Sequence, residues 1–378
     1  YYAKYQGKTY FPIVYDYLSE IGLYQWDPVL KNQQWSKLSL ESSVWPPVRY
    51  LPGDVDIRNS QAVSPFAEQD IDHPAAKHYL GTDMLGRDVL SGMIHGTRIS
   101  LTVGVLSVGI SACIGIFLGS FAGYYGDERF QTSRASLLFG IIGLFLGFYY
   151  GFFIRSYTFS DAISESFWTF GGQLLISMFI FSGIFYLFLL LSKPLERFSW
   201  LSRKQYVWID ILISRLIEIK VSVPTMLLII SIAAIAKPSL FLVMVVIGLT
   251  SWTGIARFTR GEMLKVRNLE YIQAAQSLGY PEFRIIFRHA LPNAMAPVFV
   301  SIAFGIASAI LAESSLSFLG IGVPISTVTW GALLSGARSA SGAWWLAVFP
   351  GFAIFITVTI FNLVGEGLRD ALDPRLKQ

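Results

Sequence analysis

The sequence predicts an all-α polytopic membrane protein, and two features of the composition carry that prediction. Apolar residues make up 53% of the 378 residues and charged residues only 14%, whereas a soluble globular chain is usually about a quarter charged. Several apolar runs also reach the ~20 residues that a helix needs to cross a bilayer. The net charge of +4 then indicates basic cytoplasmic loops and not a nucleic-acid partner.

The sequence has few residues or motifs that indicate a disulfide, a metal site or a nucleotide-binding loop. The lone cysteine, Cys113, lies inside an apolar run, so we expect no disulfide within this chain and a small buried hydrophobe at that position. The sequence shows no Cys/His spacing typical of a metal site and no GxxxxGK[ST] loop. The chain is therefore not expected to hold ATP phosphates itself. It begins at Tyr1 without a methionine, and we expect an upstream transmembrane helix to be missing from this numbering.

Residues 1–80 contain no run long enough to span a bilayer and are rich in Tyr, Trp and Pro. The aromatic residues argue against disorder, and the prolines argue against long helices. We expect a small loop-rich lobe on the non-cytoplasmic side. Two roles stay open for this lobe, a platform for a partner protein or a packed cap over the mouth of a pore.

Residues 81–126 are predicted to form an interfacial elbow followed by a spanning helix over 99–123. Glycines in the elbow permit tight turns, and its charged residues could pair to pin it. These elbow residues are Gly81, Asp83, Gly86, Arg87 and Asp88. A catalytic role for the carboxylates is disfavoured, because no nucleophile adjoins them and His95 is alone. Small residues along the helix are typical of close helix packing, namely Gly104, Gly109, Ala112, Gly115, Gly119 and Ala122.

Residues 127–208 contain two further apolar runs, 136–154 and 173–191, joined by the loop 155–172. Basic residues flank this pair, namely Arg129, Arg134, Lys193, Arg197, Arg203 and Lys204. By the positive-inside rule the flanks are cytoplasmic and the loop is outside. The pair is rich in Phe, so we interpret it as a peripheral, lipid-facing hairpin, with a regulatory or partner-binding role left open.

Residues 209–378 supply the remaining spans, over 210–236, 240–258, 293–311 and 346–365. Arg215 and Glu218 are spaced to pair on one helix face. Pro224 should kink its helix by removing a backbone hydrogen bond, which makes it a candidate for a gate. Glu313 is a candidate for the pore mouth, because a carboxylate in an apolar segment usually pairs or faces water; the alternative is a cap for nearby Ser and Gly backbone groups. Trp330, Trp344 and Trp345 suggest an outer aromatic belt.

The polar interruption over 260–292 separates two of these spans. Apolar residues recur in it at helical spacing, and Gly279 and Pro281 divide the run in two. We therefore expect two short helices, joined by a sharp bend, on the membrane surface. Ala274 and Ala275 on the first helix would let it sit deep in a groove of another protein. A basic interfacial helix pair without a partner is the alternative.

These motifs resemble a known family. The spacing of Ala274, Ala275, Gly279, His289, Leu291 and Pro292 resembles the EAA loop of bacterial ABC importer permeases. LGTDMLGRD, which begins at Leu80, resembles the GTDxxGRD signature of the oligopeptide/dipeptide permeases (OppC/DppC-like), and the sequences around Glu313 and at GEGLRDALDPR are also similar to that family. The opening GKTYFPIVYDY and the later WPPVRY resemble the outer segment of its Yej-type branch.

The resemblance implies a type I ABC importer permease fold with an extra inserted transmembrane hairpin and a loop-rich extracytoplasmic N-terminal lobe. The loop would be the coupling helix that docks into the ATP-binding subunit, through Gln273, Ala274, Ala275, Leu278, Gly279, His289 and Pro292. Gln273 stands where the family usually has Glu, which puts the strength of coupling in question.

Further implications concern partners. The resemblance implies a second homologous permease subunit, two ATP-binding subunits that hold ATP and Mg²⁺, and an extracytoplasmic substrate-binding protein that delivers oligopeptides or dipeptides. The chain itself would hold no cofactor or metal, would not be an enzyme, and would lie as a multi-pass protein in the cytoplasmic (inner) membrane of a bacterium, in contact with lipid.

Three other functions fit the sequence less well. An ion-coupled secondary transporter would need buried mid-membrane carboxylates or an inverted repeat, and the spans hold almost no acids. An intramembrane hydrolase would need a Ser/His or paired Asp constellation in the bilayer, but all four histidines lie outside the spans. A non-transporting structural subunit would leave the coupling loop without a purpose.

Overall fold

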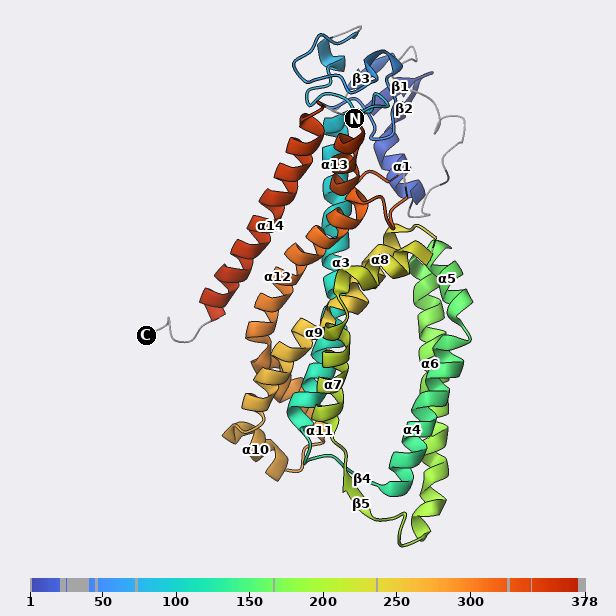
Figure 1. The fold of residues 1–378 in the computed structure, drawn as a ribbon, viewed down its shortest axis with the longest axis vertical. Coiled ribbons are helices and arrows are strands. Elements are labelled where there is room, and N and C mark those ends of the chain that lie inside the picture. The colour runs from blue at the N-terminus through green and yellow to red at the C-terminus, as the bar shows by residue number, and fades with distance from the viewer. Residues whose placement is uncertain are drawn as a thin grey trace. The chain divides into compact units, whose positions relative to one another are not determined.

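The computed structural model describes residues 2–20, 25, 41–44, 47–71, 74–165, 167–235, 237–324, 327–340 and 342–372 (Figure 1). The chain divides into two compact units, Tyr1–Ile94 and His95–Gln378. The division after Ile94 places the predicted elbow, residues 81–88, with the N-terminal unit.

The N-terminal unit contains more regular structure than the loop-rich lobe that was expected. Strands β1 (Tyr2–Tyr5), β2 (Lys8–Tyr10) and β3 (Ser42–Val44) form an antiparallel sheet in the order β2-β1-β3. The turn between β1 and β2 has positive φ at both Gln6 (51°) and Gly7 (75°), as a two-residue hairpin of matching twist requires. The described residues of this unit also include helix α1 (Pro12–Glu20) and the 3-10 turns η2 (Ile57–Asn59) and η3 (Pro74–Ala76).

The elbow is held by Asp83. Its carboxylate pairs with the Arg87 guanidinium at 2.6 Å and accepts the backbone N–H groups of Leu85 and Arg87, each at 2.9 Å. Gly81 and Gly86 have φ of +76° and +84°, and a Cβ at Gly86 would lie 2.1 Å from the backbone oxygen of Asp56. The predicted tight turns and the Asp83–Arg87 pair are therefore confirmed.

Asp88 does not join that pair, which corrects the expectation. One of its oxygens accepts the N–H of Ser91 at 2.6 Å and so caps the following helix. The other lies 2.7 Å from Nδ1 of the fully buried His78. Nε2 of His78 lies 3.4 Å from Asp56 Oδ2. Burial raises the pKa of the Asp56 carboxyl, but hydrogen bonds, first among them that from Asn59, outweigh burial and leave this pKa below its ordinary value.

Replacing His78 by leucine should loosen the N-terminal unit, because it leaves the buried Asp88 carboxylate without its imidazole partner. A buried polar group left without its hydrogen-bond partner typically costs about 1–3 kcal/mol. We expect faster cleavage of this unit in limited proteolysis of the full reconstituted chain. Lys4→Leu is the control, since the Lys4–Glu41 pair in the same unit is exposed and such pairs are worth about 0–1 kcal/mol. Equal resistance of His78→Leu and wild type would contradict this account.

The second unit is helical, and its elements follow one another along the chain. They are α3 (Val89–Tyr125, which starts in the first unit), β4 (Gln131–Ser133), α4 (Arg134–Phe148), η4 (Tyr149–Phe153), α5 (Ser156–Glu165), α6 (Phe167–Ser192), η5 (Lys193–Arg197), β5 (Lys204–Tyr206), α7 (Ile209–Ser222), α8 (Thr225–Ile235), α9 (Leu240–Val266), α10 (Glu270–Ser277), α11 (Glu282–Arg284), η6 (Ile285–Ala290), α12 (Leu291–Phe318), α13 (Trp330–Ser339) and α14 (Trp345–Leu372). Within the described ranges six helices are long and apolar enough to span a membrane, or seven if α7 and α8 count as one bent span.

Several predicted bounds were too narrow. Helix α3 begins ten residues before the expected 99, because Asp88 caps it, and α9 and α14 run to Val266 and Leu372. Part of the expected loop 155–172 is helical, in α5 and the start of α6. Hydropathy marks only the segment that lies in hydrocarbon, whereas these helices continue through their polar ends.

Helix α3 packs closely on α9, as its small residues predicted. A Cβ at Gly119 would lie 2.5 Å from the backbone oxygen of Ala256. Ser107 and Ser111 donate to backbone oxygens of Met244 and Gly248 at 3.0 and 2.8 Å. The opposite face of α3 was predicted wrongly: Gly109 has open space around it and Cys113 is exposed.

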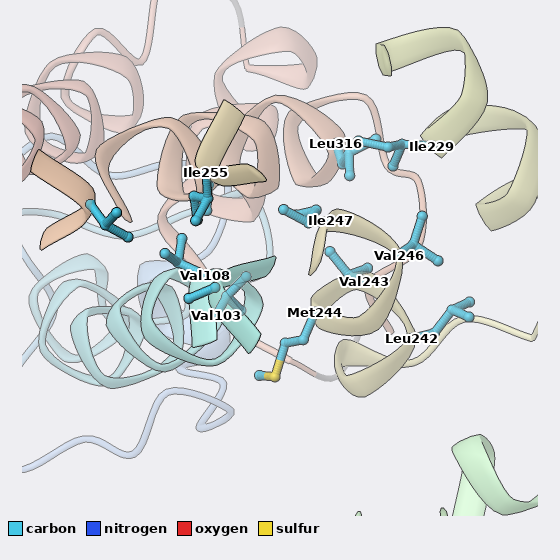
Figure 2. Close-up of a cluster of buried hydrophobic side chains, with 13 residues drawn as sticks. Val103, Val108, Ile229, Leu242, Val243, Met244, Val246, Ile247, Ile255 and Leu316 are labelled. Carbon is cyan, nitrogen blue, oxygen red and sulfur yellow. The ribbon is translucent and has the colours of Figure 1, made fainter. Parts of the chain in front are cut away.

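The largest cluster of buried hydrophobic residues draws on α3, α8, α9 and α12 (Figure 2). Val103 and Val108 come from α3, Ile247 from α9 and Leu316 from α12, and all four are at most 3% exposed. Trp330 and Trp345, expected in an outer aromatic belt, are also buried, at 3% and 5% exposure. Gly96 makes room for the Trp330 ring, since a Cβ there would lie 2.9 Å from it. Of the three tryptophans only Trp344 is exposed.

The inserted hairpin is built from α4 with η4 and from α6. Glycines of α4 leave room for phenylalanine residues of α6. A Cβ at Gly143 would lie 2.8 Å from Phe188, and one at Gly147 would lie 3.1 Å from Phe181. Most of the apolar surface of both spans is exposed on this chain, as expected for a peripheral hairpin. It meets the core through Phe170, whose ring centroid lies 5.1 Å from that of Phe241 on α9.

Pro224 separates α7 from α8, which are bent by 76°. Val223 is extended, with φ −93° and ψ 123°, because the proline ring disfavours helical backbone in the residue before it. The effect is a break and not only the predicted kink. The predicted pair of Arg215 and Glu218 is present on α7 at 2.5 Å, with both side chains exposed.

Candidate functional site

Helix α10 ends in a sharp bend at Gly279. The N–H of Gly279 donates to Gln276 O at 2.9 Å and the N–H of Tyr280 donates to Ala275 O at 3.2 Å, which is the paired bonding of a Schellman motif. Gly279 has φ +76°, where glycine is favoured because it lacks a Cβ. Pro281 follows and prevents the helix from continuing.

One face of α10 is buried in the chain. Ile272 is fully buried and Ala275 is 6% exposed, and both belong to a hydrophobic cluster with residues of α3, α9, η6 and α12. The Gln276 amide donates to the Tyr124 hydroxyl at 3.0 Å. These contacts fix the rotation of α10 about its own axis.

The opposite face is exposed, and we call Gln273, Ala274, Leu278 and Gly279 the docking face. Leu278 is 72% exposed, although leucine usually lies inside. A Cβ at Gly279 would meet nothing within 4 Å. The Gln273 amide donates to Asn268 O at 3.2 Å, so it returns to its own loop. The docking face is small and apolar at its centre, with room for another backbone to approach closely.

Two predicted coupling residues lie outside the docking face. The half-buried His289 stacks on Tyr280, with ring centroids 6.0 Å apart, and the Arg284 guanidinium lies 4.6 Å from the same ring. His289 thus supports the residue that follows the bend. Pro292 is exposed in the first turn of α12. Ala275 is the third departure, since it is buried although it adjoins Ala274 in the sequence.

The second short helix of the predicted pair does not exist as a separate element. Helix α11 has three residues and passes through the π-helical η6 into α12, forming one continuous helical segment over Glu282–Phe318. The bend at Gly279 is therefore followed directly by a spanning helix. Sequence reasoning ended the polar loop at Pro292, because a proline usually ends or kinks a helix; in the structure the π-helical η6 leads directly into α12.

Charged groups tie the ends of α3, α7 and α9 together next to α10. Arg260 of α9 holds Asp210 of α7 with both forks of its guanidinium, one of them at 2.6 Å. Arg267 donates to Gly123 O of α3 at 3.3 Å. Bidentate pairs of this kind are geometrically specific. These bonds therefore hold the helix ends beside α10 in fixed positions relative to one another.

Glu313 lies in the interior of this chain, near the end of α12 that is distant from α10 in the sequence. Its carboxylate is fully buried and accepts hydrogen bonds from the hydroxyls of Ser317, Ser314 and Ser100 at 2.6, 3.4 and 3.5 Å. A group that lines a pore needs contact with water, so this burial does not support the pore-mouth position. The alternative prediction, a cap for the backbone groups of nearby Ser and Gly residues, differs too, because these hydrogen bonds come from side-chain hydroxyls. Pro224, by contrast, is exposed at the bend between α7 and α8.

The residues that anchor α10 were not among the predicted site residues. Ile272, Ile285 and Tyr124 are fully buried beneath it. The spacing of Ile272 and Ala275, three residues apart on one helix face, was the signal that could have found the buried side. Tyr124 comes from 152 positions away and left no local signal. Among the described residues no group of three or more His, Cys, Asp or Glu is placed to hold a metal ion.

Comparison with known proteins covers most of the chain. Residues 198–378 match the family described as "Binding-protein-dependent transport system inner membrane component". The dipeptide transport system permease protein DppC of Alkalihalophilus pseudofirmus is 32% identical over 80% of this chain and 74% of its own length. DppC of Bacillus subtilis is 30% identical over 81% and 71%, and the glutathione transport system permease protein GsiD of Pectobacterium atrosepticum is 32% identical over 80% and 75%.

Among solved structures, a chain of the inward-facing MetNI methionine ABC transporter is similar at 12% identity and a TM-score of 0.47, over 75% of this chain and 96% of that one. The sequence relatives are close enough to assign the family. The chain belongs to the inner-membrane permease components of binding-protein-dependent ABC importers.

Proposed function

We propose that this permease carries short peptides and that the docking face is its contact with an ATP-binding subunit. The exposure of Ala274, Leu278 and Gly279 on a helix whose other face is locked into the core supports this proposal most directly. Relatives whose names specify dipeptides or glutathione support a short peptide as cargo.

The rest of the assembly follows from this proposal. A second permease subunit completes the pore, two ATP-binding subunits hold ATP and Mg²⁺, and an extracytoplasmic binding protein delivers the peptide. Residues 1–80 form the extracytoplasmic lobe, 81–126 the elbow and first core helix, 127–208 the insertion, and 209–378 the core helices with the coupling loop 260–292.

Coupling would begin when the ATP-binding subunits close and displace α10. Because Glu282–Phe318 is one continuous helical segment, motion of the bend is passed to α12 without an intervening loop. The bonds of Arg260 to Asp210 and of Arg267 to Gly123 would carry the same displacement to α7 and α3. ATP then drives transport only if it favours a different conformer from the empty state.

The test is the ATPase activity of the reconstituted complex, with and without loaded binding protein, for wild type and Gly279→Asp. Asp tolerates left-handed backbone better than most residues, and a side chain at Gly279 meets nothing within this chain. A side chain at φ +76° still strains the backbone, so a loss of stimulation reports on the partner when a glycine of the same conformation tolerates the same change. We expect the wild type to be stimulated and the variant to lose about tenfold or more, the effect of ~1.4 kcal/mol.

Gly320→Asp is a matched control. Gly320 follows α12 with φ +73° and the same open space, and its N–H and that of Ile321 make the same pair of bonds, to Ser317 O and Leu316 O. It should keep normal stimulation. Normal stimulation of Gly279→Asp would show that the docking face is not the coupling contact and would reopen a secondary-transport or structural role.

A further inference from the structure

The base of the inserted hairpin is an ordered structure and not a loose pair of flanks. Strands β4 and β5 pair antiparallel, with Gln131 opposite Tyr206 and Ser133 opposite Lys204. Backbone bonds extend the pairing on both sides, from Ala135 N to Leu201 O at 3.1 Å and from Val207 N to Phe130 O at 2.9 Å. We call this region, residues 128–135 and 193–208, the hairpin base.

The hairpin base carries a net positive charge, and most of its basic side chains are exposed. Lys193, Arg197, Arg203 and Lys204 are exposed, and within the described ranges Arg197, Arg203 and Lys204 form no ion pair. Of the two acidic residues of the base, Glu128 is exposed, whereas Glu196 accepts hydrogen bonds from Ser133 and Ser136 at 2.5 and 3.0 Å; they are outnumbered by the basic residues. The unmatched positive charges therefore face outward.

Aromatic side chains are exposed between these charges. Phe198, Trp200, Tyr206 and Trp208 are 65%, 61%, 52% and 64% exposed, and the Arg134 guanidinium lies 5.2 Å from the Trp200 ring centroid. Exposed tryptophan and tyrosine are typical of the headgroup layer of a bilayer, where one end of the ring is apolar and the other is wet.

The position of the hairpin base along the spans also fits the headgroup layer of a bilayer. It joins the ends of two candidate spans, Arg134–Phe153 and Trp168–Arg197, so its charges come where hydrocarbon gives way to headgroups. Figure 1 places β4 and β5 at the same end of the second unit as α10 and α11. The assignment of this end to the cytoplasmic side rests on the proposed function. The positive charge of the hairpin base and its position at the ends of two spans are observed independently of that function.

We propose that the hairpin base binds anionic phospholipid headgroups of the adjoining leaflet, with Arg197, Arg203 and Lys204 on the phosphates and Trp200 and Trp208 in the headgroup layer. Basic clusters next to a spanning helix attract anionic lipid electrostatically. An acidic protein surface would match the charge alone, but it would not account for aromatic residues exposed at the ends of two lipid-facing spans.

The test uses the whole transporter complex in vesicles of phosphatidylcholine with a trace of spin-labelled lipid. Electron paramagnetic resonance gives the association of spin-labelled phosphatidylglycerol relative to spin-labelled phosphatidylcholine. We expect wild type to prefer phosphatidylglycerol, the preference to weaken in high salt, and Arg197→Gln/Arg203→Gln/Lys204→Gln to lower it about threefold or more. The control Lys237→Gln/Arg338→Gln removes exposed charges away from the hairpin base and should change it little.

Two results would overturn the proposal. One is an unchanged preference for phosphatidylglycerol in the triple variant. The other is a wild type that shows no preference for phosphatidylglycerol over phosphatidylcholine. The lipid measurement does not depend on ATP hydrolysis, so its failure is distinguishable from failure of the Gly279→Asp test.

Discussion

Ala274→Trp is expected to abolish stimulation of the ATPase by loaded binding protein while the permease stays folded. Ala274 is exposed at the centre of the docking face, so an indole there displaces nothing within this chain. It would hold a partner backbone several ångströms away from α10. Loss of a contact at the centre of an interface typically costs about 2 kcal/mol or more, which is roughly 30-fold in affinity. The measurement is retention of the ATP-binding subunit on the purified permease, together with stimulated hydrolysis.

Ala275→Trp provides the contrast. Ala275 is 6% exposed and lies in the cluster with Ile272 and Ile286, where added volume forces neighbours apart and costs about 1–3 kcal/mol. We expect this variant to lower the unfolding temperature of the permease itself, and Ala274→Trp to leave it unchanged. If both variants lose thermal stability equally, or if Ala274→Trp retains its ATP-binding subunit, the assignment of the two faces of α10 is wrong.

Glu313→Leu is expected to have the largest effect on stability. The substitution leaves the buried hydroxyls of Ser317 and Ser100 without the carboxylate that accepts from them. Each buried polar group left unsatisfied costs about 1–3 kcal/mol, so we expect a loss of roughly 3 kcal/mol. The measurement is thermal unfolding of the purified permease in detergent.

Glu313→Gln separates hydrogen bonding from charge at this position. Its amide oxygen can still accept from Ser317, and its size is nearly that of glutamate, so we expect most of the stability to return. A leucine variant as stable as wild type would show that the hydroxyl bonds contribute nothing. Transport that fails in Glu313→Gln at wild-type stability would restore a direct role for the carboxylate.

The sequence predicted which segments span the membrane but not how they are rotated. Ala274 and Ala275 are the same residue type side by side, yet one is exposed and the other is buried. Their difference is set by Tyr124 and Ile286, which come from other parts of the chain and lie in or beside the cluster around Ile272. A single sequence carries no direct signal for such tertiary contacts.

Charged residues show the same contrast: contacts between residues close in the sequence were predicted, and contacts between distant residues were not. The bonds from Asp83 to Arg87 and from Arg215 to Glu218 link residues four and three positions apart, and helix or turn spacing was enough to predict them. Asp88 instead bonds His78, ten positions away across a loop, and Glu313 bonds Ser100, which is 213 positions away. Pairings of this second kind depend on the packed fold.

Under the proposed function, the uninterrupted segment from Glu282 to Phe318, 37 residues long, would also act as a lever. At 1.5 Å per residue it is about 55 Å long, so a tilt of about 5° about one end would move the other end by roughly 5 Å. A small change of tilt at the bend would thereby become a displacement of several ångströms at the far end of α12. The π-helical turn at Ile285–Ala290 is the place where such a lever can yield, since its wider hydrogen-bond spacing can shift register without breaking the helix. In the proposed assembly, the distance that the far end of α12 moves would then depend on these six residues, which follow the bend at Gly279, and not on residues that line the pore.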